Sequence, residues 1–516
     1  MHQSDIINFL NQPQSYGLDR GQVVKRFDTH ISVIFLAGPF AYKLKRAIKL
    51  PFVDFRKLED RAYFCQQELK ANQAASAHLY LDVIPVFQND QGTLSLDGPG
   101  TIVEWLVKMH RFDQSQLYDA LCSKGELSTH MIVRLVDQIV DCYQEAKTDT
   151  DYGGFDGINR AFDGHYKAID NCPPDVLNND KVTNLKQRVT SALCQHKGLL
   201  QTRQRDGFVR HCHGDLHLRN ICQFQDKVTL FDAIEFEPDY ALIDIFYDFS
   251  FLLMDLCHRG ETVLANAALN RYLGRTGDIE ALALSGLFLS SRATIRTHVN
   301  AVASQNQPDQ ATRTIWEEES RTYLDEALGY LTHHPVMLIA IAGLSGSGKS
   351  TLAQNLAPNL GRLPGAYIAR TDMIRKRLMG VAPEERLPQK AYDPEITQKT
   401  YSQLYSEMEI ALKAGQSVIV DGVFSRSGER RHIENLARKH GVPFKGFWLN
   451  APLELLKDRV RQRENDISDA TEEIVEMQSQ YDPGQIDWMQ IDASQTIEII
   501  YETALKEIKK LSDFTL

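Results

Sequence analysis

The chain has 516 residues, which is too many for one hydrophobic core and predicts two or three domains of ordinary size. Its composition, with 43% hydrophobic and 24% charged residues, is typical of a globular protein, and the net charge of -11 disfavours a general binder of nucleic acids or membrane surfaces. The N-terminus MHQSDIINFL lacks a basic segment followed by a long apolar core, and no apolar run reaches the length of about 18 residues that spans a bilayer. We therefore expect a cytoplasmic protein.

The first expected elements lie near the N-terminus. Residues 30–50, HISVIFLAGPFAYKLKRAIKL, alternate between apolar and polar positions and predict a hairpin of two strands. Residues 60–73, DRAYFCQQELKANQ, predict a helix, and residues 101–112, TIVEWLVKMHRF, predict a further strand.

The segment VRHCHGDLHLRNICQFQDKVTLFDAIEF, residues 209–236, carries the first chemical motif. Its order H-G-D-x-x-x-x-N has the Asp-to-Asn spacing of a kinase catalytic loop, with Gly214 in place of the usual Arg. In that chemistry Asp215 orients the attacking hydroxyl and accepts its proton, Asn220 binds Mg²⁺, and Asp232 holds the metal under the β- and γ-phosphates of ATP. A turn rich in capping residues is the alternative, although the strand that ends in Asp232 would then be a coincidence.

The string HGDLHLRN resembles the signature of the aminoglycoside phosphotransferase family, which comprises small-molecule kinases with a two-lobed protein-kinase-like fold. The resemblance covers roughly residues 31–331. Asp232 is followed by Ala-Ile rather than Phe-Gly, which fits the small-molecule kinases better than the protein kinases, and Glu235 is an extra carboxylate within reach. Asp244 and Asp248 resemble the family's structural aspartates, so we expect them to support the catalytic loop.

The same resemblance implies a phosphate-binding lysine and its ion-pair partner in the N-terminal lobe. The sequence FAYK, which ends in Lys43, is similar to the kinase motif V-A-I-K, and Lys45 on the same strand face is the competing choice. Glu68 is the expected partner of this lysine, with Glu59 as the less favoured choice. Residues 101–112 would then form the strand and hinge whose backbone binds adenine.

A junction between two domains is expected at residues 332–335, THHP, where a helix rich in Glu and Leu ends before a new strand. All eight cysteines lie between Cys65 and Cys257, without C-x-x-C pairs, which favours reduced thiols over a disulfide framework or a structural zinc site. Their absence from the second half supports two separately derived units. We therefore assign residues 1–332 and 333–516 to two domains.

The sequence GLSGSGKS, which begins at Gly343, matches the phosphate-binding pattern G-x-x-x-x-G-K-[ST] at every fixed position. The apolar run VMLIAIA precedes it and the helical segment TLAQNLAPNL follows, so the glycines lie at a strand-to-helix turn, which argues against a merely flexible loop. Converging backbone N–H groups and the helix N-terminus bind phosphate there, Lys349 reaches the β/γ oxygens, and Ser350 ligates Mg²⁺. The expected nucleotide-binding residues are Gly343, Gly346, Ser347, Gly348, Lys349, Ser350 and Thr351.

Two further strands of the second domain are expected to end in carboxylates. The segment AYIARTDMIRKRL predicts a short strand that ends in Asp372, with Arg375 one helical turn further on, and QSVIVDGVFSRSGERR predicts another strand that ends in Asp421. Such strand ends lie where open parallel sheets bind ligands. The arrangement resembles small P-loop kinases that phosphorylate hydroxyls, such as gluconate kinases, polynucleotide 5′-hydroxyl kinases and zeta-type toxins. The resemblance implies that Asp372 receives the acceptor proton, while Asp421 either holds the water shell of Mg²⁺ or has a purely structural role.

The segment FWLNAPLELLKDRVRQRENDISDATEEI predicts a strand, an arginine-rich helix and a loop. In the resembling kinases this helix and loop form a lid that closes on ATP. Arg459 and Arg463 share a helix face at the spacing i, i+4, so we expect both to contact phosphate. A salt-bridged surface helix is the alternative.

The expected fold class is an α+β two-lobed protein-kinase-like domain followed by an α/β doubly wound P-loop NTPase domain. The expected function is that of a bifunctional ATP-dependent kinase with two Mg²⁺-dependent ATP sites, each transferring the γ-phosphate to a hydroxyl of a small molecule. The alternative is that one domain is a regulatory ATP-binding module and the other is the sole kinase, acting on a nucleic-acid end or as a toxin-like kinase. Membrane partners are not expected, and nucleic acid stays open for the second domain.

Overall fold

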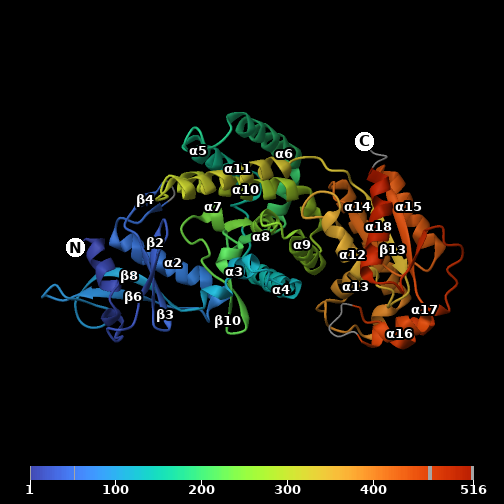
Figure 1. Ribbon diagram of the computed structural model, residues 1–516, viewed down its shortest axis with the longest axis horizontal. Coiled ribbons are helices and arrows are strands. Elements are labelled where there is room, and N and C mark those ends of the chain that lie inside the picture. The colour runs from blue at the N-terminus through green and yellow to red at the C-terminus, as the bar shows by residue number, and fades with distance from the viewer. Residues whose placement is uncertain (1, 51–52, 463–467, 513–516) are drawn as a thin grey trace. The chain divides into compact units, whose positions relative to one another are not determined.

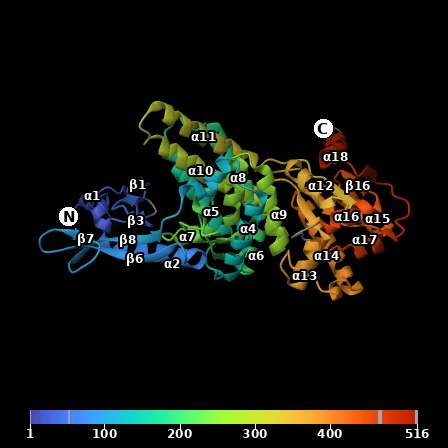
Figure 2. The same cartoon turned by 60° about the horizontal axis from the view of Figure 1, so that its bottom comes forward.

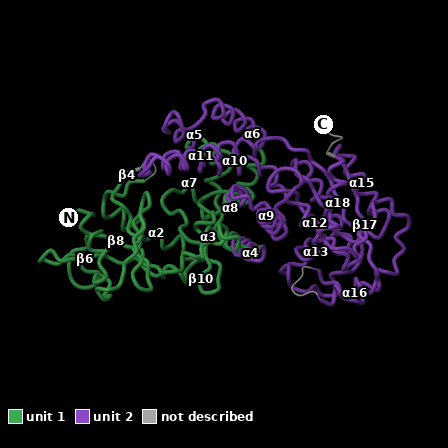
Figure 3. Tube along the Cα trace, viewed as in Figure 1, with its two compact units in different colours: residues 1–128, 141–164, 197–252 green, residues 129–140, 165–196, 253–516 purple. Residues whose placement is uncertain are grey.

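The computed structural model describes residues 2–50, 53–462 and 468–512. It divides into two compact units, coloured separately in Figure 3. Unit 1 comprises residues 1–128, 141–164 and 197–252, and unit 2 comprises residues 129–140, 165–196 and 253–516. The domain boundary expected after residue 332 stays a prediction. None of the helices in the described ranges is long and apolar enough to cross a membrane.

Unit 1 begins with a six-stranded antiparallel sheet, drawn in blue in Figure 1. Its strand order is β1-β2-β3-β8-β6-β7. The structure confirms the expected hairpin, because β2 and β3 pair in antiparallel register. Alternate residues of this hairpin point to opposite faces of the sheet: Phe35 and Tyr42 pack with helix α1, whereas Leu36 and Ala41 pack with helix α2. The elements are α1 (Gln3–Leu10), β1 (Lys25–Asp28), β2 (Ser32–Ala37), β3 (Phe40–Lys45), β4 (Lys49–Leu50), β5 (Val53–Asp54), α2 (Leu58–Ser76), β6 (Tyr80–Gln88), β7 (Leu94–Ser95) and β8 (Thr101–His110).

The expected catalytic segment forms short antiparallel strand pairs: β9 pairs with β12, which follows the segment, and β10 pairs with β11 within it. The turn between β9 and β10 carries Asp215 and Asn220, and β11 leads to Asp232. Helix α8 follows β12 directly, and the helix is buried around nearly its whole circumference. The elements are β9 (Val209–His211), the 3₁₀ helix η3 (Leu218–Asn220), β10 (Ile221–Phe224), β11 (Lys227–Leu230), α7 (Pro238–Ala241), β12 (Leu242–Asp244) and α8 (Ile245–His258).

Seven further helices precede residue 332. The last two of them form an antiparallel pair that the buried Ser320 supports, since its hydroxyl donates to the carbonyl of Thr297 over 2.7 Å. The helices are α3 (Tyr118–Ser123), α4 (Thr129–Glu145), α5 (Gly154–Asp170), α6 (Asn179–Arg205), α9 (Thr262–Thr276), α10 (Ser285–Ser304) and α11 (Gln310–Gly329).

The C-terminal part of unit 2 is a five-stranded parallel sheet in the order β14-β15-β13-β16-β17. Strands β13, β14 and β15 are buried along their whole length, as is usual in a parallel sheet that helices surround (Figure 2). Helices α12 and α18 share one core with the central strands, including Ile341, Leu352 and Ile500. The elements are β13 (Leu338–Gly343), α12 (Lys349–Leu356), β14 (Tyr367–Arg370), α13 (Thr371–Met379), α14 (Pro394–Lys413), β15 (Val418–Asp421), α15 (Ser427–His440), β16 (Phe444–Asn450), α16 (Leu453–Arg461), α17 (Glu472–Ser479), β17 (Met489–Asp492) and α18 (Ile497–Ser512). An α+β part followed by an α/β P-loop part confirms the expected fold class.

Helix α9 covers the outer edge of β14, which is an edge strand of this sheet. The amide of Asn270 replaces a neighbouring strand there: its Oδ1 accepts from the backbone N–H of Ile368 over 2.7 Å, and its Nδ2 donates to the carbonyl of Ala366 over 3.1 Å. Asn266 donates to the same carbonyl over 3.1 Å. Polar backbone groups at the sheet edge are therefore satisfied by helix side chains.

Candidate functional sites

The loop that carries Asp215 is held by the buried carboxylate of Asp248 on α8. Asp248 accepts from the backbone N–H of Gly214 over 2.8 Å, from that of His213 over 3.2 Å and from the hydroxyl of Tyr143 over 2.9 Å. Gly214 has φ +83°, and a Cβ at this position would lie 2.6 Å from the carbonyl oxygen of Tyr240. The usual kinase arginine cannot occupy this conformation without displacing backbone, which explains the glycine.

The structure brings Asp215 and Asn220 into direct contact. The Nδ2 of Asn220 donates to the main-chain oxygen and to the Oδ2 of Asp215, both over 2.9 Å. The Nε2 of His217 lies 3.3 Å from the same Oδ2. The base and the metal ligand expected from the sequence therefore lie within one hydrogen bond of each other.

The strand that leads to Asp232 is tied to this loop. His213 Nε2 donates to the carbonyl of Phe231 over 2.9 Å, and the backbone N–H of Phe231 donates to the carbonyl of Asn220 over 3.0 Å. Asp232 itself has φ +63°, a conformation that is uncommon for a residue other than glycine and turns its carboxylate toward Lys43. The structure thus places Asp215, Asn220 and Asp232 around one region of unit 1.

Two lysines of β3 converge on one glutamate of α2. Lys43 Nζ lies 2.7 Å from Glu68 Oε1, and Lys45 Nζ lies 2.6 Å from Glu68 Oε2. Lys43 also pairs with Asp232, whereas Lys45 also pairs with Glu235. Glu68, rather than Glu59, therefore lies between the lysines.

These buried ion pairs shift the pKa values of their members. Burial alone raises the pKa of Glu68, but Lys43 and Lys45 outweigh it and lower the pKa to about 2. Burial lowers the pKa of Lys43, but the carboxylates of Asp232 and Glu68 outweigh it and hold that pKa well above its usual value. Both lysines are therefore cationic at neutral pH, and Lys43 is the one that contacts the expected metal ligand.

Asp244 has a structural contact. Its two carboxylate oxygens accept from the guanidinium of Arg203 over 2.7 and 2.9 Å in a buried bidentate pair. Asp244 also accepts from the backbone N–H of Phe246 over 2.8 Å, at the start of α8. It therefore fixes the entry into the helix that carries Asp248.

In unit 2 the glycine-rich loop runs from the end of β13 to the first residue of α12. Gly343 and Gly346 have φ values of +138° and +86°, and a Cβ on them would lie 2.4 Å from the carbonyl oxygen of Leu449 and 2.5 Å from that of Leu456. Only glycine fits both positions. Lys349 begins the helix, and its Nζ donates to the carbonyl of Leu344 over 2.9 Å.

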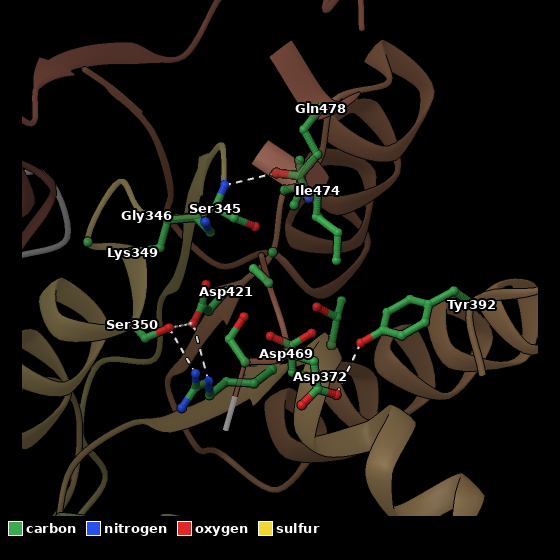
Figure 4. Close-up of a pocket in the computed structure, with 17 residues that line it drawn as sticks. Ser345, Gly346, Lys349, Ser350, Asp372, Tyr392, Asp421, Asp469, Ile474 and Gln478 are labelled. Carbon is green, nitrogen blue, oxygen red and sulfur yellow. Dashed lines mark hydrogen bonds and ion pairs between the residues drawn. The ribbon is translucent and has the colours of Figure 1, made fainter. Parts of the chain in front are cut away.

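A cleft of about 90 Å³ opens beside this loop (Figure 4). It is lined by predicted site residues from three segments: Gly346, Gly348, Lys349 and Ser350 of the loop, Asp372, and Asp421. Asp421 ends β15 as expected, whereas β14 already ends at Arg370, so the expected strand end at Asp372 is wrong. Ser350 Oγ donates to Asp421 Oδ2 over 2.6 Å. Hydroxyl and carboxylate oxygens are the donors that Mg²⁺ prefers, so this pair fits the metal expected with ATP.

Asp372 is in the first turn of α13 and faces the cleft near Asp469 and Tyr392 (Figure 4). Burial raises the pKa of its carboxyl, Asp421 raises it further, and Arg370 opposes this shift. A carboxyl with a raised pKa holds a proton more readily than an ordinary aspartate, which suits a group that accepts one.

Sequence reasoning missed three residues of this cleft. Arg370 is the last residue of β14, and its position two residues before Asp372 was a local signal that could have identified it. Asp469 accepts from Lys376 Nζ over 3.2 Å, from the backbone N–H of Leu387 over 3.1 Å and from the hydroxyl of Tyr392 over 3.2 Å. Gln478 Oε1 accepts from the backbone N–H of Ser345 over 2.9 Å. Asp469 lies in the loop of the expected lid segment, residues 447–474, although sequence reasoning did not single it out, and Gln478 lies beyond that segment.

The remaining predicted residues lie elsewhere or beyond the described ranges. Arg459 of α16 donates to the carbonyl of Ala493 over 2.9 Å and is absent from the lining of the cleft. Arg463 lies outside the described residues. Ser347 and Thr351 belong to the loop and to α12, and the hydroxyl of Ser347 is buried.

The parallel sheet, the glycine-rich loop and the carboxylates at the carboxyl ends of β14 and β15 define the C-terminal part as a P-loop domain, with Asp421 ending β15 and Asp372 in the helix turn after β14. Residues 338–483 match the model of a family described as an AAA domain. An uncharacterized protein of Mycobacterium tuberculosis is 27% identical over 456 residues, which cover 87% of this chain and 88% of that protein. The adenylyl-sulfate kinase of Myxococcus xanthus is 25% identical over 122 residues, or 23% of this chain and 60% of that enzyme.

Similar solved structures include kinases. A gluconokinase from Sinorhizobium meliloti is 19% identical with a TM-score of 0.26, and the match covers 36% of this chain and 97% of that one. A choline/ethanolamine kinase family protein from Mesorhizobium loti is 12% identical with a TM-score of 0.37, and the match covers 60% of this chain and 92% of that one.

Proposed function

We propose that the chain is a bifunctional ATP-dependent phosphotransferase with two separate ATP sites, each of which transfers the γ-phosphate to a hydroxyl of a small molecule. The observation that supports the proposal is that each unit brings together carboxylates, a lysine and further oxygen atoms of the kinds that such a reaction needs. Asp215 contacts Asn220 in unit 1, and Ser350 contacts Asp421 in unit 2. The kinase names among the similar proteins of known activity support the same reaction class.

In unit 1, Asp215 would accept the proton of the acceptor hydroxyl, with Asn220 holding its carboxylate in place. Asn220 and Asp232 would hold Mg²⁺, which neutralises charge on the β- and γ-phosphates when it is bound. Lys43 would pair with those phosphates, and Glu68 would keep its ammonium in position.

In unit 2, the backbone of the glycine-rich loop and Lys349 would bind the phosphates of ATP. Ser350 and Asp421 would hold Mg²⁺ beside the same phosphates. Asp372 would orient the acceptor hydroxyl and take its proton, because it faces the cleft from the neighbouring strand end.

The proposal is tested with full-length protein and labelled ATP against a panel of hydroxyl-bearing metabolites and oligonucleotides. The matched variants are Asp215→Ala, which removes the base of unit 1, and Lys349→Ala, which removes the phosphate-binding lysine of unit 2. We expect each variant to lose transfer to one acceptor and to keep transfer to the other within a few fold.

Loss of both activities from either single change, in protein that melts like the parent, would contradict two independent catalytic sites. That result would favour the alternative in which one nucleotide site regulates the other. Transfer only to oligonucleotide ends would contradict the small-molecule part of the proposal.

A further inference from the structure

Arg370 contacts both oxygen ligands of the expected metal site in unit 2. Its Nη2 donates to Ser350 Oγ over 3.0 Å, and its Nε lies 3.3 Å from Asp421 Oδ2. Ser350 donates to that same Oδ2 over 2.6 Å, so the three side chains form a closed triangle. The arginine side chain is only 10% exposed and lines the cleft.

These contacts use the same atoms that a metal would need. The hydroxyl of Ser350 donates to Asp421 and accepts from Arg370, so one of its two lone pairs and its proton are already engaged, and the guanidinium lies where a metal would approach. A guanidinium and a divalent cation at the same carboxylate oxygen also repel each other, and a largely buried site screens that repulsion weakly. Arginine and metal therefore compete for Ser350 and Asp421.

We propose that Arg370 is a displaceable counter-cation, which neutralises Asp421 and occupies Ser350 and Asp421 before Mg²⁺-ATP binds and gives them up to the metal. This inference rests on the proposed function of the P-loop site, and it assigns Arg370 as a competing counter-ion rather than a catalytic residue. The displaced guanidinium has a second carboxylate nearby, because Arg370 is the largest favourable charge acting on Asp372. Its charge therefore stays in the cleft after it leaves the metal ligands.

The proposal makes opposite predictions for ATP with and without metal. When Mg²⁺ is absent, Arg370 is a cation beside the phosphates and favours ATP binding. When Mg²⁺ is present, the arginine must first be displaced, which weakens metal binding. Removal of the arginine should therefore weaken metal-free ATP binding and at the same time strengthen Mg²⁺ binding.

The experiment measures ATP binding by calorimetry in full-length protein that carries Asp232→Ala, so that the site in unit 1 contributes little. Lys349→Ala in this background identifies the heat that belongs to the P-loop site. Arg370→Ala, Arg370→Lys and the control Arg438→Ala are then compared in EDTA and across a Mg²⁺ titration. Arg438 is an exposed arginine of α15, so its removal changes net charge without touching the cleft.

For Arg370→Ala we expect metal-free ATP affinity to fall about fivefold and the Mg²⁺ concentration for half-maximal ATP binding to fall by a similar factor. Both quantities in Arg370→Lys should lie between those of the parent and of Arg370→Ala, because a lysine keeps the charge but lacks the planar guanidinium that bonds to two oxygens at once. Arg438→Ala should match the parent. Thermal melting of each variant checks the fold.

Equal weakening of ATP binding in EDTA and in Mg²⁺ would overturn the inference, since it would make Arg370 an ordinary phosphate or structural residue. An unchanged Mg²⁺ midpoint in both Arg370 variants would overturn it too. By contrast, if the heat of ATP binding were the same in the parent protein and in Lys349→Ala, the result would contradict the proposed function itself.

Discussion

Asp248 accepts a 2.8 Å hydrogen bond from the backbone N–H of Gly214, and this contact joins helix α8 to the loop that carries Asp215. Gly214 leaves space for the carbonyl of Tyr240 that no other residue type would leave. The loop is thus held by a helix carboxylate and by backbone packing, with a glycine at the position where the protein-kinase motif has an arginine.

Replacement of Asp248 by Asn should disorder this loop. An amide keeps the size of the carboxylate but accepts on one side only, so one of the three donors is left without an acceptor. We expect a stability loss of about 1–3 kcal/mol and a large loss of transfer in unit 1. Tyr143→Phe is the matched control, since it removes one donor to Asp248 and leaves both loop N–H groups paired. Equal losses of transfer in the two variants would argue against a role for Asp248 in the loop.

Asp215 and Asp232 should differ in metal dependence. Asp232→Ala removes an expected metal ligand that also pairs with Lys43, so Mg²⁺-ATP binding in unit 1 should be lost. Asp215→Ala should keep that binding and lower turnover by orders of magnitude. Calorimetry in a Lys349→Ala background measures the first quantity, and single-turnover transfer measures the second. Activity in both variants on an identified acceptor would rule out this assignment.

Asp372→Asn should abolish transfer in unit 2 and leave its ATP affinity within a few fold, because the residue is expected to act on the acceptor. In the parent, the carboxyl must be ionised to accept a proton, and burial raises its pKa. Activity should therefore rise with pH through a value above about 4, the ordinary pKa of aspartate. A collapse of ATP binding in Asp372→Asn would instead assign Asp372 to the metal.

The same substitution should stabilise the folded protein at neutral pH. A carboxyl whose pKa is raised by folding binds its proton more tightly in the folded state, so its favourable contribution is complete at low pH and is lost as pH rises through the folded pKa. At pH 7 to 8 the ionised Asp372 thus costs stability that Asn avoids. We expect Asp372→Asn to raise the melting temperature there, with a difference that shrinks toward pH 4. A lower melting temperature at pH 8 would contradict this.

Asn270→Leu should destabilise unit 2, because the side chain satisfies backbone groups on both sides of Tyr367 at the edge of β14. The substitution leaves the backbone N–H of Ile368 without its acceptor, which costs about 1–3 kcal/mol for a buried group, whereas the carbonyl of Ala366 keeps its hydrogen bond from Asn266. Asn270→Asp is the control, since it keeps the acceptor for Ile368 and loses only the donor to Ala366. Chemical unfolding, monitored by tryptophan fluorescence, should give a lower free energy of unfolding for Asn270→Leu than for Asn270→Asp. Equal free energies of unfolding would show that α9 does not support this strand.

Much of each candidate site could be predicted because its motif is local in sequence. Gly343 and Gly346 are needed where the chain turns from a strand into a helix, and residues that are close together in the sequence specify that turn. The pairing of Asp215 with Asn220 follows from a five-residue spacing in the same way. The choice between Glu68 and Glu59 was harder, because α2 could present either carboxylate until its packing on β3 was known.

The sequence by itself determined the fold class and the glycine-rich turn between β13 and α12, because these depend on patterns between neighbours in the chain. Only the tertiary structure decided that Arg370 lies on Ser350 and Asp421, since these residues come from three different segments that meet at the end of a parallel sheet. Asn270 reaches β14 for the same reason, across almost 100 residues of chain. Such contacts arise from the packing of whole helices and strands, and local sequence patterns do not predict them.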